Sequence, residues 1–210
     1  MMTLYDFPKA PSPRRARIVL AEKRIAHETV IIDMMTAEQM GDAYRAINPN
    51  CTIPALRLDD GTVLADNAGI AAWAEAMVPE PPLLGTSPIE KAEIASWNSR
   101  IESDGLMPIA EALRNSNPAM KDRALPGPAN FPQIPALAER GLARLATFLD
   151  MLNARLEGRD FVATHRFSLA DITAVVAIDF ARAVRVTPRE DHAQLRAWRA
   201  RMAERPSMSL

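Results

Sequence analysis

Two neighbouring polar residues, Asp66 and Asn67, stand directly before a run of apolar residues with helical spacing. Both residues are good helix N-caps, and the run predicts one buried helical stripe at Ile70, Trp73, Ala74 and Met77. The free N–H groups in the first turn of such a helix favour an anion, while the carboxylate of Asp66 favours a cation. This corner can therefore hold both charged ends of an α-amino acid.

A predicted β-hairpin leads into that helix. Ile53 to Leu58 and Thr62 to Leu64 are short apolar runs, and the Asp60-Gly61 pair between them supplies the positive-φ residues of a tight turn. The bond between Ile53 and Pro54 is either cis or trans, and the sequence leaves this open. A cis bond would leave the backbone N–H and C=O of Ile53 free to pair with an extended peptide.

Composition excludes several classes of function. The chain has 210 residues, 48% hydrophobic and 24% charged, with a net charge of −1, which indicates a globular protein without a nucleic-acid or membrane-surface footprint. No run of 18 apolar residues occurs, so we expect no membrane partner and a cytoplasmic location.

The reactive residue types are few. Cys51 is the only cysteine, which excludes an internal disulfide and any Cys-x-x-Cys site. The three histidines (His27, His165 and His192) have no metal-ligand spacing, so we predict no metal. Any thiol chemistry would need a thiol from a cosubstrate.

The elements that position these residues follow a recognisable order. We predict a strand from Thr3 to Phe7, a helix from Pro13 to about Arg24 with Ser12 as its N-cap, a strand from Thr29 to Ile32 and a weak helix over 36–47, before the hairpin and its helix. The order β-α-β-α-β-β-α is thioredoxin-like, and its first β-α-β predicts a parallel strand pair.

The remainder of the chain has a helical pattern. Four prolines within 78–88 indicate a linker, which divides the chain into domains at 1–77 and 88–210 with the linker at 78–87. We predict a long helix from Ile89 to about Leu113 that starts at Ser87-Pro88 and kinks at Gly105 and Pro108, a second that ends at Gly158, and a central buried helix over 169–183. That last helix begins with Ser168 as N-cap, Asp171 at N3 and an apolar staple of Phe167 and Ile172.

Several of these motifs together resemble the glutathione S-transferase family, in a bacterial, serine-type-like form. They are Asn48-Pro49, Thr52-Ile53-Pro54-Ala55-Leu56, Asp60-Gly61 and Asp66-Asn67, joined in the second half by the capped helix, Trp198 and the closing run over 201–206. Asn67 departs from the Glu/Asp-Ser pair that is usual in the family. The resemblance covers essentially the whole chain and implies an α/β thioredoxin-like N-terminal domain, an all-α C-terminal domain and a homodimer.

The resemblance also implies a cosubstrate and its binding residues. Glutathione would be held by Ile53, Pro54, Asp66 and Asn67. The hydroxyl that stabilises its thiolate in serine-type members falls on Ala10, which has no donor, so Ser12 is the best remaining hydroxyl. Ser12 can be interpreted equally well as the hydrogen-bond donor to the thiolate or as a plain helix cap. A protein that has lost its thiolate donor altogether is a further alternative.

An electrophile would bind beside the thiolate in such a protein. The resemblance places Phe7, Lys9, Ala10, Ser103, Asp104 and Met107 around it, with solvated helix residues as the alternative interpretation of Asp104. The function implied is conjugation of glutathione to a small hydrophobic electrophile. The alternatives are a glutathione-dependent disulfide or peroxide reductase, and a non-catalytic binding or regulatory protein.

Overall fold

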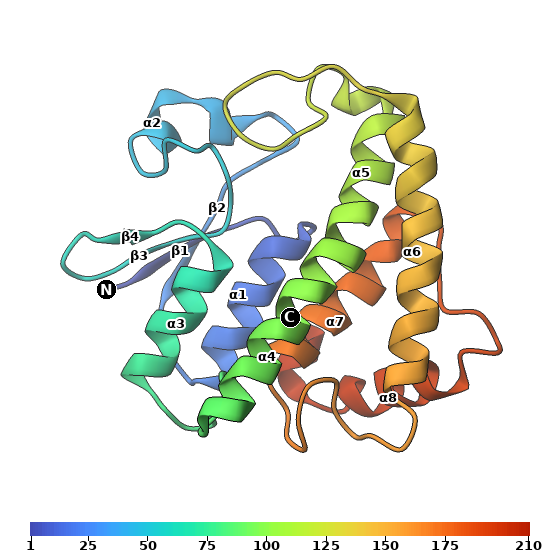
Figure 1. The fold of residues 1–210 in the computed structure, drawn as a ribbon. Helices are drawn as coiled ribbons and strands as arrows, with labels where there is room; N and C mark the ends of the chain where they lie inside the picture. The colour runs from blue at the N-terminus through green and yellow to red at the C-terminus, as the bar shows by residue number, and fades with distance from the viewer. The chain divides into compact units, whose positions relative to one another are not determined.

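The computed structural model describes residues 1–210, which form two compact units (Figure 1). The first unit comprises Met1–Pro81 with the loop Leu125–Asn130, and the second comprises Pro82–Ala124 with Phe131–Leu210. All the strands lie in the first unit, and the second is built from helices. The fold class expected from the sequence is confirmed, whereas nothing in the sequence indicated that the loop 125–130 belongs to the first unit.

The first unit contains a four-stranded sheet in the order β2-β1-β3-β4. β1 and β2 are parallel, and β3 runs antiparallel to both β1 and β4. The predicted order β-α-β-α-β-β-α is therefore confirmed. The elements are β1 (Thr3–Asp6), α1 (Pro11–Glu22), β2 (Glu28–Ile31), a 3-10 turn (Glu38–Met40), α2 (Asp42–Arg45), β3 (Ala55–Arg57), β4 (Val63–Leu64) and α3 (Asn67–Met77).

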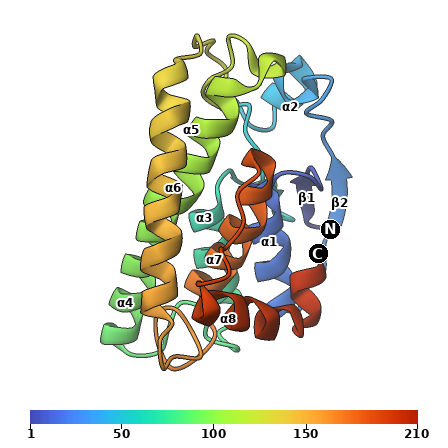
Figure 2. The ribbon, with the colours of Figure 1, turned by 90° about the vertical axis from the view of Figure 1, so that its right-hand side faces the viewer.

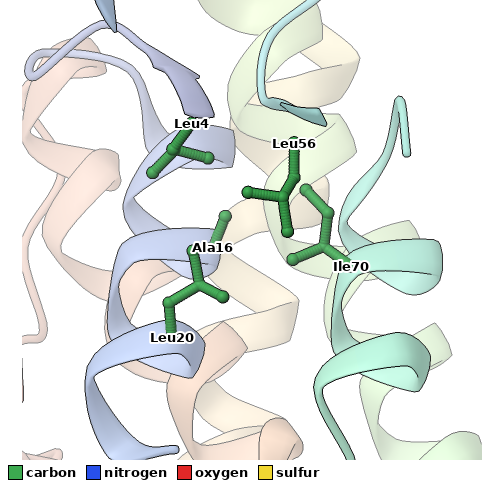
Figure 3. Close-up of a cluster of buried hydrophobic side chains, with 5 residues drawn as sticks. All are labelled: Leu4, Ala16, Leu20, Leu56 and Ile70. Carbon is green, nitrogen blue, oxygen red and sulfur yellow. The ribbon is translucent and has the colours of Figure 1, made fainter. Parts of the chain in front are cut away.

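One face of the sheet packs against α1 and α3, which lie side by side in Figure 1. Leu4 of β1 and Leu56 of β3 are fully buried there against Ala16 and Leu20 of α1 and Ile70 of α3 (Figure 3). Successive strand residues point to opposite faces, so their neighbours Tyr5 and Ala55 point the other way.

The second face of the sheet has its own buried cluster. Tyr5, Ala55 and Ile53 pack there with Tyr44 of α2, whose ring meets that of Tyr5 edge-on at a centroid distance of 5.8 Å. Phe7 and Ala10 pack against the same cluster. The end of β1 and the start of β3 are thereby joined in one apolar core.

Two details of the hairpin and its helix differ from expectation. Gly61 has a positive φ as expected, but Asp60 does not. The Asp60 carboxylate accepts a hydrogen bond from the Thr62 N–H at 2.9 Å, which stabilises the turn. Met77 was predicted to be buried but is 62% exposed, since α3 ends at that residue. Ile70 and Ala74 are buried as predicted.

A buried lysine anchors the chain where it leaves α3. The Nζ of Lys23, which follows α1, donates to the carbonyls of Val78 and Pro79 at 2.8 and 3.2 Å and pairs with the Glu75 carboxylate. The ammonium is wholly buried, so these acceptors replace the water it would otherwise bind. Lys23 therefore fixes the first residues of the predicted linker to the end of α1.

The second unit is built from α4 (Pro88–Ile101), α5 (Met107–Ser116), α6 (Pro135–Arg155), α7 (Leu169–Phe180) and α8 (Ala193–Ala203). Short 3-10 turns cover Pro118–Met120, Ala181–Val184 and Pro206–Ser209. A π-helical turn over Glu102–Leu106 joins α4 to α5, at the place where a kink was predicted. None of these helices, nor any in the first unit, is long and apolar enough to cross a membrane.

The central helix α7 begins as the sequence predicted. Asp171 is fully buried, and its carboxylate accepts hydrogen bonds from the Ser168 N–H, the Ser168 hydroxyl and the Val162 N–H at 2.8 to 3.0 Å. Burial raises the pKa of Asp171 to about 6. This capping box ties the start of α7 to the loop that precedes it.

Helices α5 and α6 run side by side and approach closely (Figure 2). A Cβ added to Gly141 of α6 would lie 2.6 Å from the carbonyl oxygen of Pro108 and 3.0 Å from the backbone nitrogen of Ala112. Backbone atoms cannot move aside as a flexible side chain can. Glycine is therefore required at position 141 for this packing.

We expect Gly141→Ala to lower the free energy of unfolding by about 1–2 kcal/mol. A clash with backbone atoms should cost about 2–3 kcal/mol, the upper part of the range for overpacking, and alanine gains back roughly 1 kcal/mol in a helix. Chemical denaturation measures the change. Gly69→Ala is the matched control, since its Cβ would lie at an ordinary 3.5 Å from Asp66 Oδ1. A Gly141→Ala protein as stable as wild type would contradict the close approach.

We expect Glu90→Gln to remove part of the acid sensitivity of the fold. Hydrogen bonds from the Thr86 hydroxyl and N–H hold the pKa of Glu90 at about 2, below its ordinary 4.5. A lowered folded pKa contributes stability that is present above pH 4.5 and is lost as the pH falls through about 2. The stability difference between wild type and Glu90→Gln should thus be largest above pH 5 and shrink towards pH 2, as measured by denaturation across this range. A difference that does not vary with pH would contradict the assignment.

Candidate functional site

Three segments that are far apart in the sequence meet at one end of the sheet. Leu56 pairs with Leu64 and Arg57 with Val63, so the continuation of this antiparallel register brings Pro54 towards Asp66. Tyr5 pairs with Ala55, and the same reasoning brings Phe7 towards Ile53, with which it shares a core cluster. The predicted residues Phe7, Ile53, Pro54, Asp66 and Asn67 therefore gather at this sheet end.

The start of α3 has the predicted geometry. Asp66 is the N-cap, and its Oδ1 accepts a hydrogen bond from the Gly69 N–H at 2.7 Å. The backbone N–H groups of Asn67 and Ala68 form no hydrogen bond within the protein, as expected in a first helical turn. The exposed carboxylate of Asp66 thus lies directly beside two free donors.

The bond between Ile53 and Pro54 is cis, which resolves the choice that the sequence left open. Ile53 lies just before β3, and its backbone N–H and C=O form no hydrogen bond within the protein. A donor and an acceptor on one residue can pair with an extended backbone, as an added strand would. Backbone pairing groups are therefore available next to Asp66.

The start of α1 corrects one prediction. The helix begins at Pro11, two residues earlier than expected, and Ala10 is its N-cap without a side-chain hydrogen bond. Ser12 is thus the second residue of the helix and not its cap. Proline fits at Pro11 and again at Pro13, because neither position needs an N–H partner within the first turn.

This arrangement leaves Ser12 with unpaired polar groups. Pro11 and Pro13 have no N–H, so Ser12 carries the only backbone donor among the first three residues of α1, and that donor forms no hydrogen bond. Its hydroxyl forms no hydrogen bond within the protein either, and the residue is half-buried. Both groups can stabilise an anion at this helix N-terminus.

The loop between β1 and α1 is held by an ion pair that the sequence analysis missed. Arg17 of α1 donates from Nη1 to the buried carboxylate of Asp6 at 2.5 Å and from Nη2 to the Pro8 carbonyl at 3.3 Å. The loop carries the predicted residues Phe7, Lys9 and Ala10, of which Lys9 is exposed. Arg17 therefore fixes the segment that leads to Ser12.

The remaining predicted residues, Ser103, Asp104 and Met107, lie in the second unit on the π-helical turn and the start of α5. The Ser103 hydroxyl donates to the Arg100 carbonyl at 3.2 Å and to Asp104 Oδ1 at 3.1 Å. Arg144 of α6 donates to the Ser103 carbonyl at 2.7 Å. The turn is thereby fixed, with Ser103 and Met107 exposed.

The arrangement suits a small peptide better than a metal ion. No group of three or more His, Cys, Asp or Glu side chains is placed to hold a metal. The free donors at Ser12, Asn67 and Ala68 and the backbone groups of Ile53 instead offer hydrogen bonds to carboxylates, amides and a thiolate.

Comparison with known proteins agrees with this chemistry. The model of the glutathione S-transferase N-terminal domain matches residues 11–77, and that of the C-terminal domain matches residues 117–206. The chain is 33% identical to Glutathione S-transferase 2 of Saccharomyces cerevisiae over 99% of its own length and 88% of that protein. This chain belongs to the glutathione S-transferase family.

Other relatives extend the comparison. The crystal structure of Gtt2 from Saccharomyces cerevisiae superimposes with a TM-score of 0.89 at 32% identity, covering 99% of this chain and 98% of that one. FtsZ-localized protein A of Caulobacter vibrioides is 28% identical over 97% of this chain and 87% of that protein. The name of this relative does not refer to catalysis.

We expect Asp66→Ala to destabilise the protein by about 1 kcal/mol, because the Gly69 N–H loses its cap. Asp66→Asn should cost much less, since its side-chain oxygen can still accept that hydrogen bond. Chemical denaturation of both variants measures the difference. Equal losses for the two variants would show that charge, and not capping, is what Asp66 contributes to the fold.

Proposed function

We propose that this protein conjugates the thiolate of glutathione to a small hydrophobic electrophile. One observation carries the proposal. The free backbone N–H and C=O of Ile53 lie at the same sheet end as the start of α3, where Asp66 is the N-cap. Glutathione presents the complementary groups, which are an amide backbone and a glutamyl end with one ammonium and one carboxylate.

In this proposal each end of the glutamyl group has a partner. The Asn67 and Ala68 N–H groups bind its carboxylate, and Asp66 pairs with its ammonium. The cysteinyl backbone pairs with the N–H and C=O of Ile53 next to Pro54. All the residues proposed to make these contacts lie in the first unit.

Ser12 is proposed to stabilise the thiolate. Its hydroxyl and its N–H donate to the sulfur, which lowers the pKa of a thiol that is ordinarily near 8.5. With an aryl chloride, the sulfur forms a bond to the ring carbon, chloride leaves with the bonding electron pair, and the thiol proton passes to solvent. The active species is thus generated before the electrophile reacts.

The other parts of the proposal rest on likeness to the family. Phe7, Lys9 and Ala10 of the first unit and Ser103, Asp104 and Met107 of the second are the residues proposed to contact the electrophile. The same likeness supports a homodimer that works in the cytoplasm and uses no metal.

Calorimetric titration with glutathione, followed by an assay with a chloronitrobenzene, tests the proposed function. We expect saturable binding at one site per chain and steady release of chloride that depends on glutathione. Binding without turnover would reject conjugation, and the absence of binding would reject the glutathione site itself.

Two other activities have one observation each in their favour. Ala10 lacks a hydroxyl where serine-type members have one, which favours glutathione-dependent reduction of a disulfide or peroxide. The likeness to FtsZ-localized protein A favours a binding protein without catalysis. Reduction of a model disulfide in preference to conjugation would identify the first, and absence of both reactions would favour the second.

We expect Ser12→Ala to raise the pKa of the bound thiol by about 1–2 units, because a hydrogen bond to a charged group contributes about 1.5–3 kcal/mol. Turnover at neutral pH should fall about tenfold or more, and part of it should return at higher pH. Thiolate absorbance of the glutathione complex measures the pKa. Ser209→Ala, an exposed serine hydroxyl near the C-terminus, is the control and should leave both values unchanged. An unchanged thiol pKa in Ser12→Ala would mean that the residue serves the fold alone.

A further inference from the structure

The carbonyl of Thr52 accepts two side-chain hydrogen bonds. Tyr44 of α2 donates from its hydroxyl at 2.7 Å, and Asn48 donates from Nδ2 at 2.7 Å. Asn48 also reaches the Thr52 hydroxyl oxygen at 3.2 Å. Both acceptor positions of this carbonyl are thus used by groups that neither the sequence analysis nor the proposed function assigns to binding.

The two donors are themselves fixed in place. Tyr44 and Asn48 are 2% and 1% exposed, and the ring of Tyr44 packs edge-on against that of Tyr5. The Oδ1 of Asn48 accepts the Asn50 N–H at 3.1 Å, and its backbone carbonyl accepts the Cys51 N–H at 3.0 Å. Burial raises the pKa of Tyr44 to about 12, so its hydroxyl keeps the proton that it donates.

The peptide bond transmits this restraint to Ile53. The bond between Thr52 and Ile53 is trans and planar, so its N–H points opposite to its C=O. Holding the Thr52 carbonyl therefore aims the Ile53 N–H away from Tyr44 and Asn48. That N–H is the unpaired donor at the candidate site.

We propose that Tyr44 and Asn48 are positioning residues that fix the Thr52-Ile53 peptide plane so that the Ile53 N–H is preorganised to bind the glutathione backbone. The inference rests on the proposed function, since it assigns the restraint to that same site. A donor that is already oriented loses little freedom on binding, so affinity rises without a new contact. The restraint should therefore change the affinity for glutathione and leave the rate of bond formation at sulfur unchanged.

Tyr44→Phe tests the inference, because it removes one donor and keeps the buried ring. We expect the Kd and the KM for glutathione to rise about fivefold, the effect of one hydrogen bond, with kcat and the KM for a chloronitrobenzene unchanged. Tyr5→Phe is the matched control, since it removes a hydroxyl from the neighbouring ring without touching Thr52. Its glutathione affinity should equal that of wild type.

A second variant and a second measurement guard against misfolding. Tyr44→Phe combined with Asn48→Ala leaves the Thr52 carbonyl without a side-chain donor and should weaken binding further than Tyr44→Phe alone. The backbone order parameter of the Ile53 N–H, measured by NMR relaxation without glutathione, should be lower in Tyr44→Phe than in Tyr5→Phe. This readout needs neither turnover nor ligand.

The outcomes separate this inference from the function on which it rests. Wild type that binds glutathione, with Tyr44→Phe binding equally well or losing kcat instead of affinity, overturns the positioning role and leaves the proposed function standing. Wild type that does not bind glutathione overturns both. A selective loss of glutathione affinity with a lower order parameter at the Ile53 N–H supports the positioning role.

Discussion

The antiparallel setting of β3 between β1 and β4 is the constraint on which the candidate site depends. A strand that runs against both neighbours begins where they end, so the first residues of β3 lie beside the segments that leave β1 and β4. Register fixes this meeting, because a slip by one residue would turn Leu4 and Leu56 out of the core in Figure 3. The buried core and the site are therefore specified by the same pairing.

The N-termini of α1 and α3 at this sheet end differ in the hydrogen-bond donors that they leave free. In α3 the N-cap Asp66 satisfies one donor and leaves two others free beside a negative charge. In α1 the N-cap Ala10 satisfies none, and Pro11 and Pro13 remove the donors on either side of Ser12. The first arrangement suits a group that carries both charges, whereas the second concentrates hydrogen bonding on one residue. Sequence alone sets this contrast, since it depends on which residues lack an N–H.

Signals carried within a few residues predicted most of the fold. The N-cap at Ser87, the capping box at Ser168 and the N-cap at Asp66 are local, and each forms as expected. The start of α1 was missed because Ser12-Pro13 and Ala10-Pro11 both fit a proline in the first turn, and no capping hydrogen bond distinguishes them.

Interactions between distant residues gave no such signal. Lys23 binds carbonyls more than 50 residues away, and nothing in its neighbourhood in the sequence indicates that it is buried. Arg17 and Tyr44 belong to no recognisable motif, and their partners Asp6 and Thr52 lie 11 and 8 residues away, beyond the span of a capping or turn motif. The sequence therefore identified residues that could contact a ligand, but it could not identify those that hold them in place.

In the proposed function, the position of Ser12 determines how much stabilisation the thiolate can receive. A fall of two units in thiol pKa corresponds to roughly 2.7 kcal/mol, and a hydrogen bond to a charged group of about 1.5–3 kcal/mol with a helix N-terminus of about 0.3–1 kcal/mol can supply it. A serine at position 10 would offer its hydroxyl from the N-cap, outside the helix. Ser12 offers a hydroxyl and a free N–H from the first turn itself, where the helix dipole acts on the same anion. In the proposed function, a hydroxyl two residues further into α1 therefore keeps the means to stabilise a thiolate.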